Sequence, residues 1–458
     1  MSFEKKFLES SRPHILMITN HGIHQWKIIP GLPDTGGQNV FVNQFTESLA
    51  KQGYKITIIN RGGYAHPVSG EPRKGIHYKD ENQRILFLED DVHAFVRKED
   101  MDDQLPELAA ALTHHLKNNE QKVDLIISHY WDGAKLGLLF NRTLDSPVPN
   151  VWVPHSLGAI KKRNIDPDQW VALRIDERID NEKKILQAVD GVASTSAIIE
   201  KSLREDYGYL IEPFFLPPCV DPDRYYPREI QEDHPVLRFL STLCDLSPVE
   251  IISSQIITEI SRTDQTKRKD VLLRAFAKLL QKHPGSLLLI SIEQKKEGLS
   301  NHLMDLISEL GIEKRVVVLG SVWDELPDIY ALTDIFCTPS VMEGFGMTSQ
   351  EAAATAVPVV ASNLVPFVTE YLLDEDVKEI PVEGSDVPLK LGEGAIVVQA
   401  DDVNGFAFAL DLLLSNLELR RKLGEAAYKI TIPYFTWENI VKTFLEDVQG
   451  LMHDEVHN

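Results

Sequence analysis

Short apolar runs rich in β-branched residues alternate along the chain with longer stretches whose apolar residues recur at helical spacing. The first run, His14–Asn20, is followed by the amphipathic segment Gly37–Gln52 and by a second run, Lys55–Arg61. Continuous apolar strands that alternate with helices indicate a parallel sheet covered on both faces. Further strands of this first set are expected at Arg84–Glu89, Asp124–His129, Asn150–His155, Gly191–Ser196 and Pro213–Pro218.

The alternation pauses over residues 221–249, which carry prolines and mixed charge but no clean strand pattern. It then restarts, and this predicts a second doubly wound α/β unit joined to the first near residue 221. Residues 374–393 look like an acidic surface insertion in that unit. The strands of the second set are expected at Ile256–Ile260, Ser286–Ile290, Val316–Gly320, Ile335–Ser340, Pro358–Ser362 and Ala395–Gln399.

The last helical segment is Phe435–Met452, with Thr436 as its N-cap. Its periodicity allows two placements, because it could be a terminal helix of the second unit or cross back onto the first.

Composition narrows the class of protein. The 458 residues are 43% apolar and 25% charged, which is typical of globular proteins and excludes disordered and collagen-like chains. A net charge of −22 leaves no basic surplus for a nucleic-acid partner. Three widely spaced cysteines make neither a disulfide framework nor a zinc site. There is no signal-peptide pattern and no apolar run long enough to span a membrane, so we expect a cytoplasmic protein.

In open parallel sheets, ligands bind beyond the carboxyl ends of the strands. After the first strand, Gly36 and Gly37 open a helix, and free N–H groups at such a helix N-terminus can bind a phosphate. The loop is neither a Walker loop nor a G-x-G-x-x-G fingerprint, and a plain glycine turn is the alternative. His129 and His155 end later strands, where each is either a ligand contact or a hydrogen-bonded structural histidine.

Cationic side chains gather after the strands of the first unit. Arg174 and Arg178 stand four apart on a helix expected over residues 167–187, on one face. With Lys161 they could hold a phosphate. The alternative is a solvated face on which they pair with nearby carboxylates such as Glu177.

The second unit carries the strongest motif. Two cations, Arg262 and Lys267, flank the turn after its first strand, where they could reach one diphosphate from two sides. Farther on, Glu343 and Glu351 bracket a Gly-x-Gly loop that follows a strand and opens an Ala-rich helix. The loop exposes backbone N–H groups at that helix N-terminus. Glu351, one turn inside the helix, suits a ribose diol, and Glu343 would face a sugar.

Together these residues resemble family 4 of the retaining glycosyltransferases, whose GT-B fold has two facing Rossmann-like domains with a cleft between them. The likeness is greatest to the sucrose-phosphate synthase branch, through the runs DTGGQ (34–38), SHYWDGAKLG (128–137) and HSLGAIK (155–161). PPCVD (217–221) resembles the interdomain Pro-Pro-Gly-Val motif, with Cys219 in place of Gly.

The resemblance divides the chain into three parts. Residues 1–222 would form the N-terminal acceptor-binding domain, and residues 223–432 the nucleotide-sugar donor-binding domain. Residues 433–458 would form a helix that returns to the N-terminal domain.

Carried over position by position, the resemblance also assigns site residues. The catalytic set would be Arg262, Lys267, His155 and Glu343, in which the first two bind the donor diphosphate and the others contact the hexose. Donor binding would add Gly36, Gly37, Gly344, Phe345, Gly346, Met347 and the ribose-binding Glu351. The acceptor would meet Gln38, Lys98, Tyr130, Lys161 and Arg178, three of which match positions that grip a phosphate.

The reaction implied is transfer of a hexose, expected to be glucose, from a nucleotide-sugar to a phosphorylated sugar by same-face attack. Sucrose-6-phosphate formation from UDP- or ADP-glucose and fructose 6-phosphate is the first expectation. Mannosylfructose-phosphate or mannosylglucosyl-phosphoglycerate synthesis is the alternative. No cofactor or metal is expected, because fixed cations can stabilise the leaving group and the strings Asp166-Pro167-Asp168 and Asp221-Pro222-Asp223 read as turns. A separate phosphatase would act on the product.

Two other classes share this architecture. A nucleotide-sugar 2-epimerase has the donor pocket but no acceptor, and a non-catalytic sensor would bind a nucleotide-sugar without turnover. Lys98, Lys161 and Arg178 argue against the epimerase. Glu177 stands where the branch often has a second Arg beside Arg178, and Asn363-Leu364-Val365-Pro366 replaces an Asn-Gly-Gly-Pro loop, so the two sugars stay open.

Overall fold

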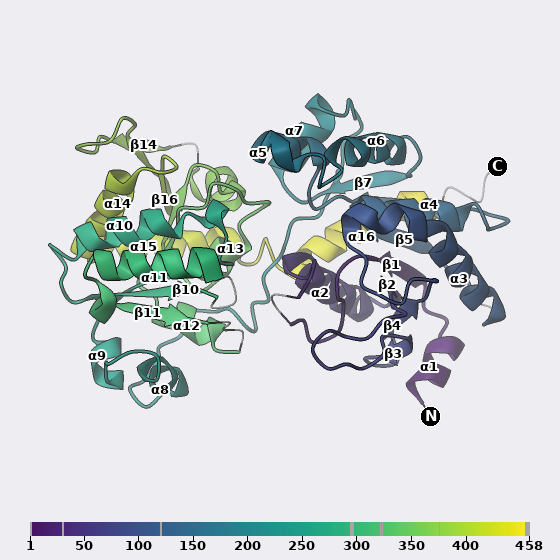
Figure 1. Cartoon of the computed structure of the whole chain (residues 1–458), viewed down its shortest axis with the longest axis horizontal. Coiled ribbons are helices and arrows are strands. Elements are labelled where there is room, and N and C mark those ends of the chain that lie inside the picture. The colour runs from purple at the N-terminus through teal and green to yellow at the C-terminus, as the bar shows by residue number, and fades with distance from the viewer. Residues whose placement is uncertain are drawn as a thin grey trace. The chain divides into compact units, whose positions relative to one another are not determined.

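A computed structural model describes residues 2–29, 32–119, 121–293, 297–320, 322, 324–374 and 376–453. The chain forms two compact units (Figure 1). The first comprises Met1–Pro217 together with Trp437–Asn458, and the second comprises Pro218–Thr436. Each unit is built on one eight-stranded sheet with helices packed against it, as a GT-B fold requires.

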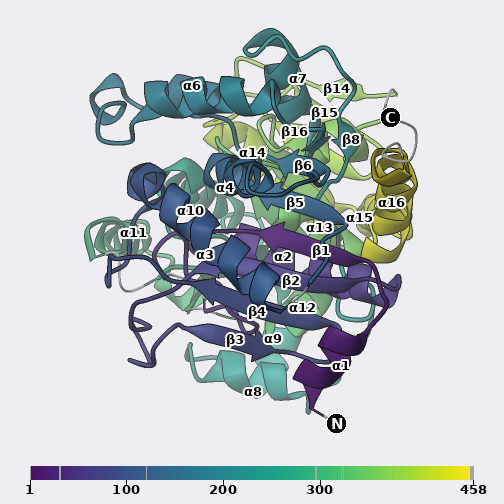
Figure 2. The ribbon, with the colours of Figure 1, turned by 90° about the vertical axis from the view of Figure 1, so that its right-hand side faces the viewer.

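The sheet of the first unit has the strand order β3-β4-β2-β1-β5-β6-β7-β8. All neighbours are parallel except β3, which pairs antiparallel with β4 at one edge. In Figure 2, β4, β2, β1 and β5 lie side by side. The strands are β1 (His14–Ile18), β2 (Lys55–Arg61), β3 (Gly75–Tyr78), β4 (Gln83–Leu88), β5 (Leu125–His129), β6 (Asn150–Val153), β7 (Gly191–Ser194) and β8 (Phe214–Phe215).

The helices of the first unit follow the strands in the alternation that the sequence predicts. They are α1 (Phe3–Glu9), α2 (Gly37–Lys51), α3 (Leu105–Asn118), α4 (Tyr130–Asn141), α5 (Gly158–Asn164), α6 (Ile175–Leu186), α7 (Ala197–Glu205) and α16 (Trp437–His453). Two 3₁₀ turns, η1 (Lys98–Gln104) and η2 (Pro167–Gln169), precede α3 and α6.

The second unit has the order β11-β10-β9-β12-β13-β16-β15-β14. Its parallel strands are β9 (Gln255–Glu259), β10 (Ser286–Ser291), β11 (Val316–Leu319), β12 (Ile335–Thr338), β13 (Val359–Ser362) and β16 (Ala395–Val398). The expected acidic insertion at 374–393 contains β14 (Lys378–Ile380) and β15 (Leu389–Leu391), an antiparallel hairpin that extends the sheet beyond β16. The pattern did not predict these two strands.

Helices cover the second sheet as well. They are α8 (Pro235–Ser241), α9 (Pro248–Ile252), α10 (Lys269–Leu279), α11 (Glu297–Glu309), α12 (Leu326–Leu332), α13 (Met347–Ala354), α14 (Val403–Ser415) and α15 (Leu417–Thr431). Shorter turns are η3 (Gln265–Lys267), η4 (Glu313–Arg315) and the π-helical η5 (Val368–Leu372). The pause in the alternation, 221–249, holds α8 and the start of α9.

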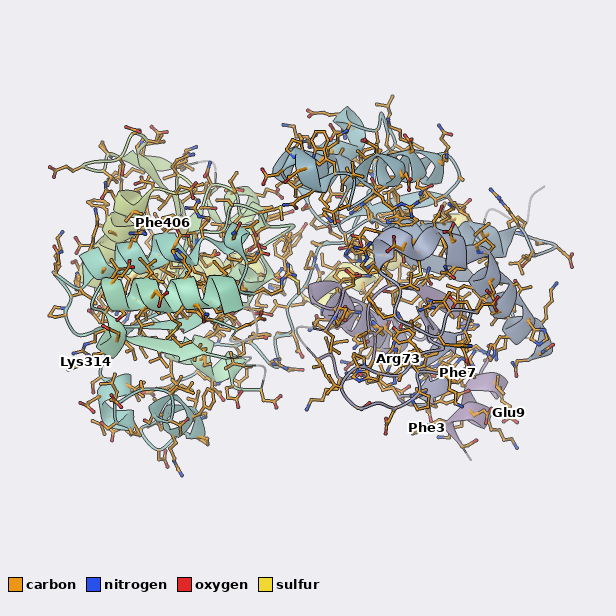
Figure 3. All side chains as sticks on the ribbon, in the orientation of Figure 1. Phe3, Phe7, Glu9, Arg73, Lys314 and Phe406 are labelled. Carbon is orange, nitrogen blue, oxygen red and sulfur yellow. The ribbon has the colours of Figure 1, made fainter. Side chains whose placement is uncertain are left out.

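Apolar side chains fill both units (Figure 3). Phe406 of α14 is fully buried in the second core, where it packs with residues of α10 and β16. In the first unit, Phe7 of α1 is also buried, and the guanidinium of Arg84 lies over its ring at 4.1 Å from the centroid. Each sheet therefore has its own core, and its strand ends are held in fixed positions.

The C-terminal helix α16 packs against α2 of the first unit. The indole of Trp437 stacks on Phe45 with ring centroids 5.7 Å apart, and its Nε1 donates a hydrogen bond to Gln44 Oε1 at 3.0 Å. Phe444, about two turns further along the same face of α16, contacts the same Phe45 ring edge-on at 5.5 Å. The chain thus ends on the unit in which it begins.

The prediction of a helix over residues 167–187 is wrong for the first part of that range. Residues Pro167–Gln169 form η2, and α6 begins only at Ile175. Arg174 has a left-handed φ of 46°, which an α-helix excludes, so it caps α6 instead of lying inside it. Arg174 and Arg178 therefore do not share a helical face.

Candidate active site

The loops that follow β1 place the N-terminus of α2. Gly22 has a φ of 76°, and a Cβ there would lie 2.3 Å from the carbonyl oxygen of Asp34, so only glycine fits. Gly36 caps α2, and its N–H donates to Asn39 Oδ1 at 2.9 Å. The glycines predicted to bind a diphosphate thus open a helix, with Gln38 in its first turn.

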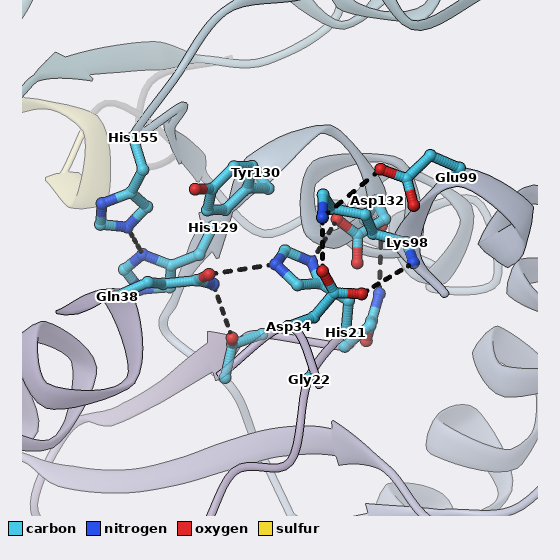
Figure 4. A network of polar contacts seen from close by, with 12 residues as sticks. His21, Gly22, Asp34, Gln38, Lys98, Glu99, His129, Tyr130, Asp132 and His155 are labelled. Atoms are coloured by element: carbon cyan, nitrogen blue, oxygen red, sulfur yellow. Dashed lines mark hydrogen bonds and ion pairs between the residues drawn. The ribbon is translucent and has the colours of Figure 1, made fainter. Parts of the chain in front are cut away.

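Gln38 is held by residues that were not among the predicted site residues. Its Oε1 lies 3.0 Å from Nε2 of His21, and its Nε2 donates to the hydroxyl of Thr19 at 2.9 Å (Figure 4). His21 Nδ1 in turn lies 2.9 Å from Oδ1 of Asp132. The signal available in the sequence was position alone, because His21 and Asp132 follow the parallel neighbours β1 and β5.

His155 lies beside Tyr130 and His129. Its Nε2 is 2.7 Å from Nδ1 of His129, its ring stacks on Tyr130 at 5.5 Å, and Phe41 meets it edge-on at 4.9 Å. Burial lowers the pKa of His155 to about 3. The ring is therefore neutral near pH 7, and it can exchange hydrogen bonds with a sugar hydroxyl but not supply a positive charge.

The three predicted phosphate-gripping residues line one pocket of the first unit. Lys98 comes from η1, Lys161 from α5 and Arg178 from α6, and Trp131 and Arg174 complete part of the wall. Segments far apart in sequence thus bring three cationic side chains together in a protein of net charge −22. The carboxylates of Glu99, Asp102 and Glu177 line the same pocket, so the excess of positive charge is small, and an anionic ligand group would be attracted to a cation that these carboxylates leave unpaired.

Two of these cations already have carboxylate partners, as the alternative interpretation expected. The ammonium of Lys98 contacts Asp34 and lies 3.4 Å from Glu99 (Figure 4). Arg178 Nε donates to the buried Glu182 at 2.8 Å, and its Nη2 donates to Ser156 Oγ at 2.9 Å. These contacts fix both side chains in the pocket wall, but neither pair lies on a solvated face.

Lys161 differs from its two neighbours. Within the described part of the chain, no carboxylate lies at ion-pair distance from its ammonium. Burial and the positive charges of Lys98 and Arg178 together lower its pKa to about 8. Glu177, on the same pocket wall, pairs with Arg174 at 2.7 Å. Lys161 is therefore the cation that an incoming anion would complement.

In the second unit, the loop between β9 and α10 carries the predicted diphosphate-binding pair. Lys267 is 8% exposed, and its ammonium lies 2.5 Å from Oε1 of Glu343. Arg262 lies exposed at the start of the loop. At the loop base, Lys269 forms a fully buried ion pair with Glu259 and donates to the hydroxyl of Ser261 at 2.8 Å.

The Gly-x-Gly loop precedes α13 as the sequence predicts. Gly346 has a φ of 110°, and a Cβ there would lie 2.7 Å from Cγ1 of Val365. The N–H of Phe367 donates to the carbonyl of Phe345 at 2.7 Å and ties the loop to the segment after β13. Gly344 lies exposed beside Glu343, and Met347 begins the helix. The backbone of this loop is thus rigidly presented at a helix N-terminus.

Glu351 lies one turn inside α13, partly buried. The hydroxyl of Tyr330 donates to its Oε2 at 3.1 Å. Burial raises the pKa of Glu351 to about 7, and the hydrogen bond from Tyr330 and the nearby charge of Arg224 limit that rise. Near neutral pH this carboxyl is therefore poised between its two forms.

The two Asp-Pro-Asp strings lie at turns. Asp166 precedes η2, and Asp221 Oδ1 accepts a hydrogen bond from the N–H of Asp223 at 3.0 Å. Across the described residues, no three His, Cys, Asp or Glu side chains are grouped as metal ligands. No helix in the described part of the chain is long and apolar enough to cross a membrane.

Comparison with known families agrees with this arrangement in both units. Residues 35–224 match the family described as Glycosyltransferase Family 4, and residues 253–430 match the one described as Glycosyl transferases group 1. The chain belongs to glycosyltransferase family 4. The two matches fall one in each structural unit, so the resemblance predicted from the motifs is confirmed.

Three proteins illustrate what this glycosyltransferase is similar to. It is 28% identical to mannosylfructose-phosphate synthase of Agrobacterium fabrum, over 76% of each chain. It is 28% identical to D-inositol 3-phosphate glycosyltransferase of Nocardia farcinica, over 92% of this chain and 86% of the relative. The structure of sucrose-phosphate synthase from Thermosynechococcus elongatus superposes with a TM-score of 0.76 at 22% identity, covering 97% of this chain and 100% of the other.

Proposed function

We propose that this glycosyltransferase moves a hexose from a nucleotide-sugar to a phosphorylated sugar, with retention of anomeric configuration and without a metal. The observation that carries the proposal is the convergence of Lys98, Lys161 and Arg178 on one pocket from three separate segments. Glucose transfer to fructose 6-phosphate, from a UDP- or ADP-linked donor, is the reaction we favour. The names of all three similar proteins include a sugar phosphate or an inositol phosphate, which supports a phosphorylated acceptor.

The pocket has the charge that a phosphate would complement. Lys98 and Arg178 are fixed by Asp34 and Glu182, so they present their remaining donor positions in set directions. Lys161 lacks a carboxylate partner within the described residues. A phosphate dianion would supply the counterion that Lys161 lacks, and charged hydrogen bonds of this kind are short and strong.

The donor would bind the second unit. Arg262 and Lys267 would meet the diphosphate, and the backbone from Gly344 to Met347 with Glu343 would meet the hexose hydroxyls. Glu351 would accept hydrogen bonds from the ribose diol, for which its carboxylate form is required. Negative charge grows on the diphosphate as the glycosidic bond breaks, and a preorganised cation such as Lys267 stabilises that charge.

Retention would follow from attack on the same face that the diphosphate leaves. The bond from the anomeric carbon to the diphosphate oxygen breaks, and the bond from that carbon to the acceptor oxygen forms. The acceptor hydroxyl proton passes to the departing phosphate oxygen, so no protein base is needed. Neutral His155 would hold a hexose hydroxyl, and Gln38 and Tyr130 would contact the acceptor sugar.

A mannosyl donor is the second candidate, because mannosylfructose-phosphate synthase is among the similar proteins. Both reactions give a phosphorylated disaccharide, so a separate phosphatase would be required to release the free sugar. A donor screen against fructose 6-phosphate distinguishes the two candidates.

The test is nucleoside diphosphate release with UDP-, ADP- and GDP-linked glucose and mannose, with and without fructose 6-phosphate. We expect rapid release only when donor and acceptor are both present, with a new phosphorylated disaccharide as product. Conversion of the donor alone would instead identify an epimerase. Donor binding without release under any acceptor would identify a sensor, and either result would refute the proposal.

A further inference from the structure

His21 and Asp132 form a buried pair in the first unit, and the pair contacts Gln38. The side chains of His21 and Asp132 are 3% and 0% exposed. Nδ1 of His21 faces Asp132 Oδ1 at 2.9 Å, and Nε2 faces the amide oxygen of Gln38 at 3.0 Å (Figure 4). Each ring nitrogen of His21 therefore lies at hydrogen-bond distance from an oxygen atom, of the Asp132 carboxylate on one side and of the Gln38 amide on the other.

Gln38 has its amide orientation fixed from both ends. Its oxygen lies 3.0 Å from Nε2 of His21, and its Nε2 donates to the hydroxyl of the buried Thr19 at 2.9 Å. An amide oxygen has a second acceptor position and the amide nitrogen has a second hydrogen. Gln38 is half-buried in the first turn of α2, so it can present one donor and one acceptor to a bound sugar.

We propose that His21 donates a hydrogen bond to Asp132 and another to Gln38, and that the His21–Asp132 pair is thereby a positioning element that fixes the orientation of the Gln38 amide and selects the hydroxyl pattern of the acceptor sugar. The proposal rests on the proposed function, because it assumes that Gln38 contacts the acceptor. His21 and Asp132 act through Gln38 and are positioning residues in this account.

The proton on His21 is the physical basis of the selection. A neutral His21 would keep its Nδ1 hydrogen on Asp132 and turn the Nε2 lone pair toward Gln38. That lone pair repels the amide oxygen and attracts the amide N–H. The side-chain amide of Gln38 would therefore rotate by half a turn, and its NH₂ group and its oxygen would exchange positions. A sugar whose hydroxyls suit the first pattern would then face two mismatched groups, each of which costs a hydrogen bond.

The groups around His21 define what else can influence its proton. From α4 it faces Asp132 and the ring of Tyr130, whose centroid is 4.7 Å away. A positive charge on His21 lowers the pKa of Asp34, in the loop before α2. It also lowers the pKa values of the neighbouring His129 and His155. The Asp34 carboxylate is itself paired with Lys98. Asp132 is the carboxylate that touches the ring, so its neutralisation should release the proton most directly.

The first test does not depend on activity. The histidines of the ligand-free protein are labelled with ¹⁵N, and His21→Gln assigns the His21 signals. We expect both His21 nitrogens of the wild type to carry hydrogen at pH 7, and Asp132→Asn to leave Nε2 without a hydrogen at the same pH. A bare Nε2 in the wild type at pH 7 would overturn the proposal, whatever the substrate of the enzyme is.

The second test is kinetic, with UDP-glucose and fructose 6-phosphate. We expect Asp132→Asn to raise the KM of fructose 6-phosphate by about tenfold or more, since charged hydrogen bonds are involved, and to leave the donor KM unchanged. In Gln38→Ala, addition of Asp132→Asn should have no further effect on the acceptor KM, because the pair acts through Gln38.

The matched control is His24→Gln, because His24 is a buried histidine of the same loop region that contacts Asn39 and Asn43 instead of Gln38. It should leave the acceptor KM and its pH profile unchanged. Additive effects of Asp132→Asn and Gln38→Ala would overturn the proposal. If the wild type does not use fructose 6-phosphate, the favoured reaction fails, while the ¹⁵N experiment still decides the state of His21.

Discussion

Lys267 and Glu343 form an ion pair with a separation of 2.5 Å between Nζ and Oε1. The two residues lie 76 positions apart and follow different strands, β9 and β12. The pair joins the residue that we expect at the leaving diphosphate to the residue that we expect at the donor hexose. A conformational change that moves one loop would therefore move the other. The contacts that we expect with the diphosphate and with the hexose would then keep their relative positions.

Lys267→Ala should lower kcat strongly without unfolding the protein. The ammonium acts on charge that develops as the bond breaks, and removal of one such group typically costs ~3 kcal/mol, or about a hundredfold in rate. Lys278→Ala is the matched control, because Lys278 of α10 is exposed and binds only Asn404 in the described structure. Steady-state kinetics with a circular dichroism check measures both variants. Turnover close to that of the wild type in folded Lys267→Ala would refute the assignment.

Donor affinity should rise with pH through neutrality. The pKa of Glu351 is raised to about 7, so its carboxyl is protonated below pH 7 and loses acceptor capacity for the ribose diol. The donor KM should increase as pH falls from 8 to 6, at a limiting slope of about tenfold per pH unit. Glu351→Gln should remove this dependence. A donor KM that is flat over the same range in the wild type would contradict the ribose assignment.

Acceptor affinity should show the opposite trend at higher pH. The pKa of Lys161 is lowered to about 8, so the ammonium loses its proton above pH 8 and no longer attracts a phosphate. The KM of fructose 6-phosphate should rise above pH 8, and Lys161→Arg should move this rise beyond the accessible range because a guanidinium stays charged. If the wild type and Lys161→Arg show the same acceptor profile, another group controls phosphate binding.

Activity should persist in excess chelator. Arg262 and Lys267 would supply the positive charge that a divalent ion supplies in other transferases, and the Asp-Pro-Asp strings form turns. The measurement is nucleoside diphosphate release after dialysis against EDTA, with magnesium or manganese added back as the control. Loss of activity that either metal restores would show that the leaving group needs an ion.

The fold was predictable because strands that are buried in a parallel sheet consist of continuous runs of apolar residues. The antiparallel strands β3, β14 and β15 lie at or next to a sheet edge, and they were missed because they are short, partly exposed and contain polar residues. Arg174 was placed inside a helix because its left-handed backbone leaves no mark in the apolar periodicity. Sequence propensities describe local structure, whereas the left-handed backbone of Arg174 depends on the tertiary structure around it.

Residues of the candidate site were predictable only where they belong to a recognisable sequence motif. The runs around Gly37, Glu343 and Lys161 marked positions whose roles the family resemblance supplied. The pairing of His21 with Asp132 joins residues 111 positions apart, and no spacing rule connects them. Lys161 was named, but its lack of a carboxylate partner among the described residues depends on where the surrounding side chains point.

The most direct test compares kcat/KM for fructose 6-phosphate and for free fructose with the same donor, in the wild type and in Lys161→Ala. We expect the wild type to prefer the phosphorylated sugar. The variant should lose about 1.5–3 kcal/mol of that preference, the range for a charged hydrogen bond, while the donor KM stays unchanged. Arg178→Ala is less suitable, because it would leave Glu182 buried without its partner. Equal use of the two acceptors by the wild type would contradict the account.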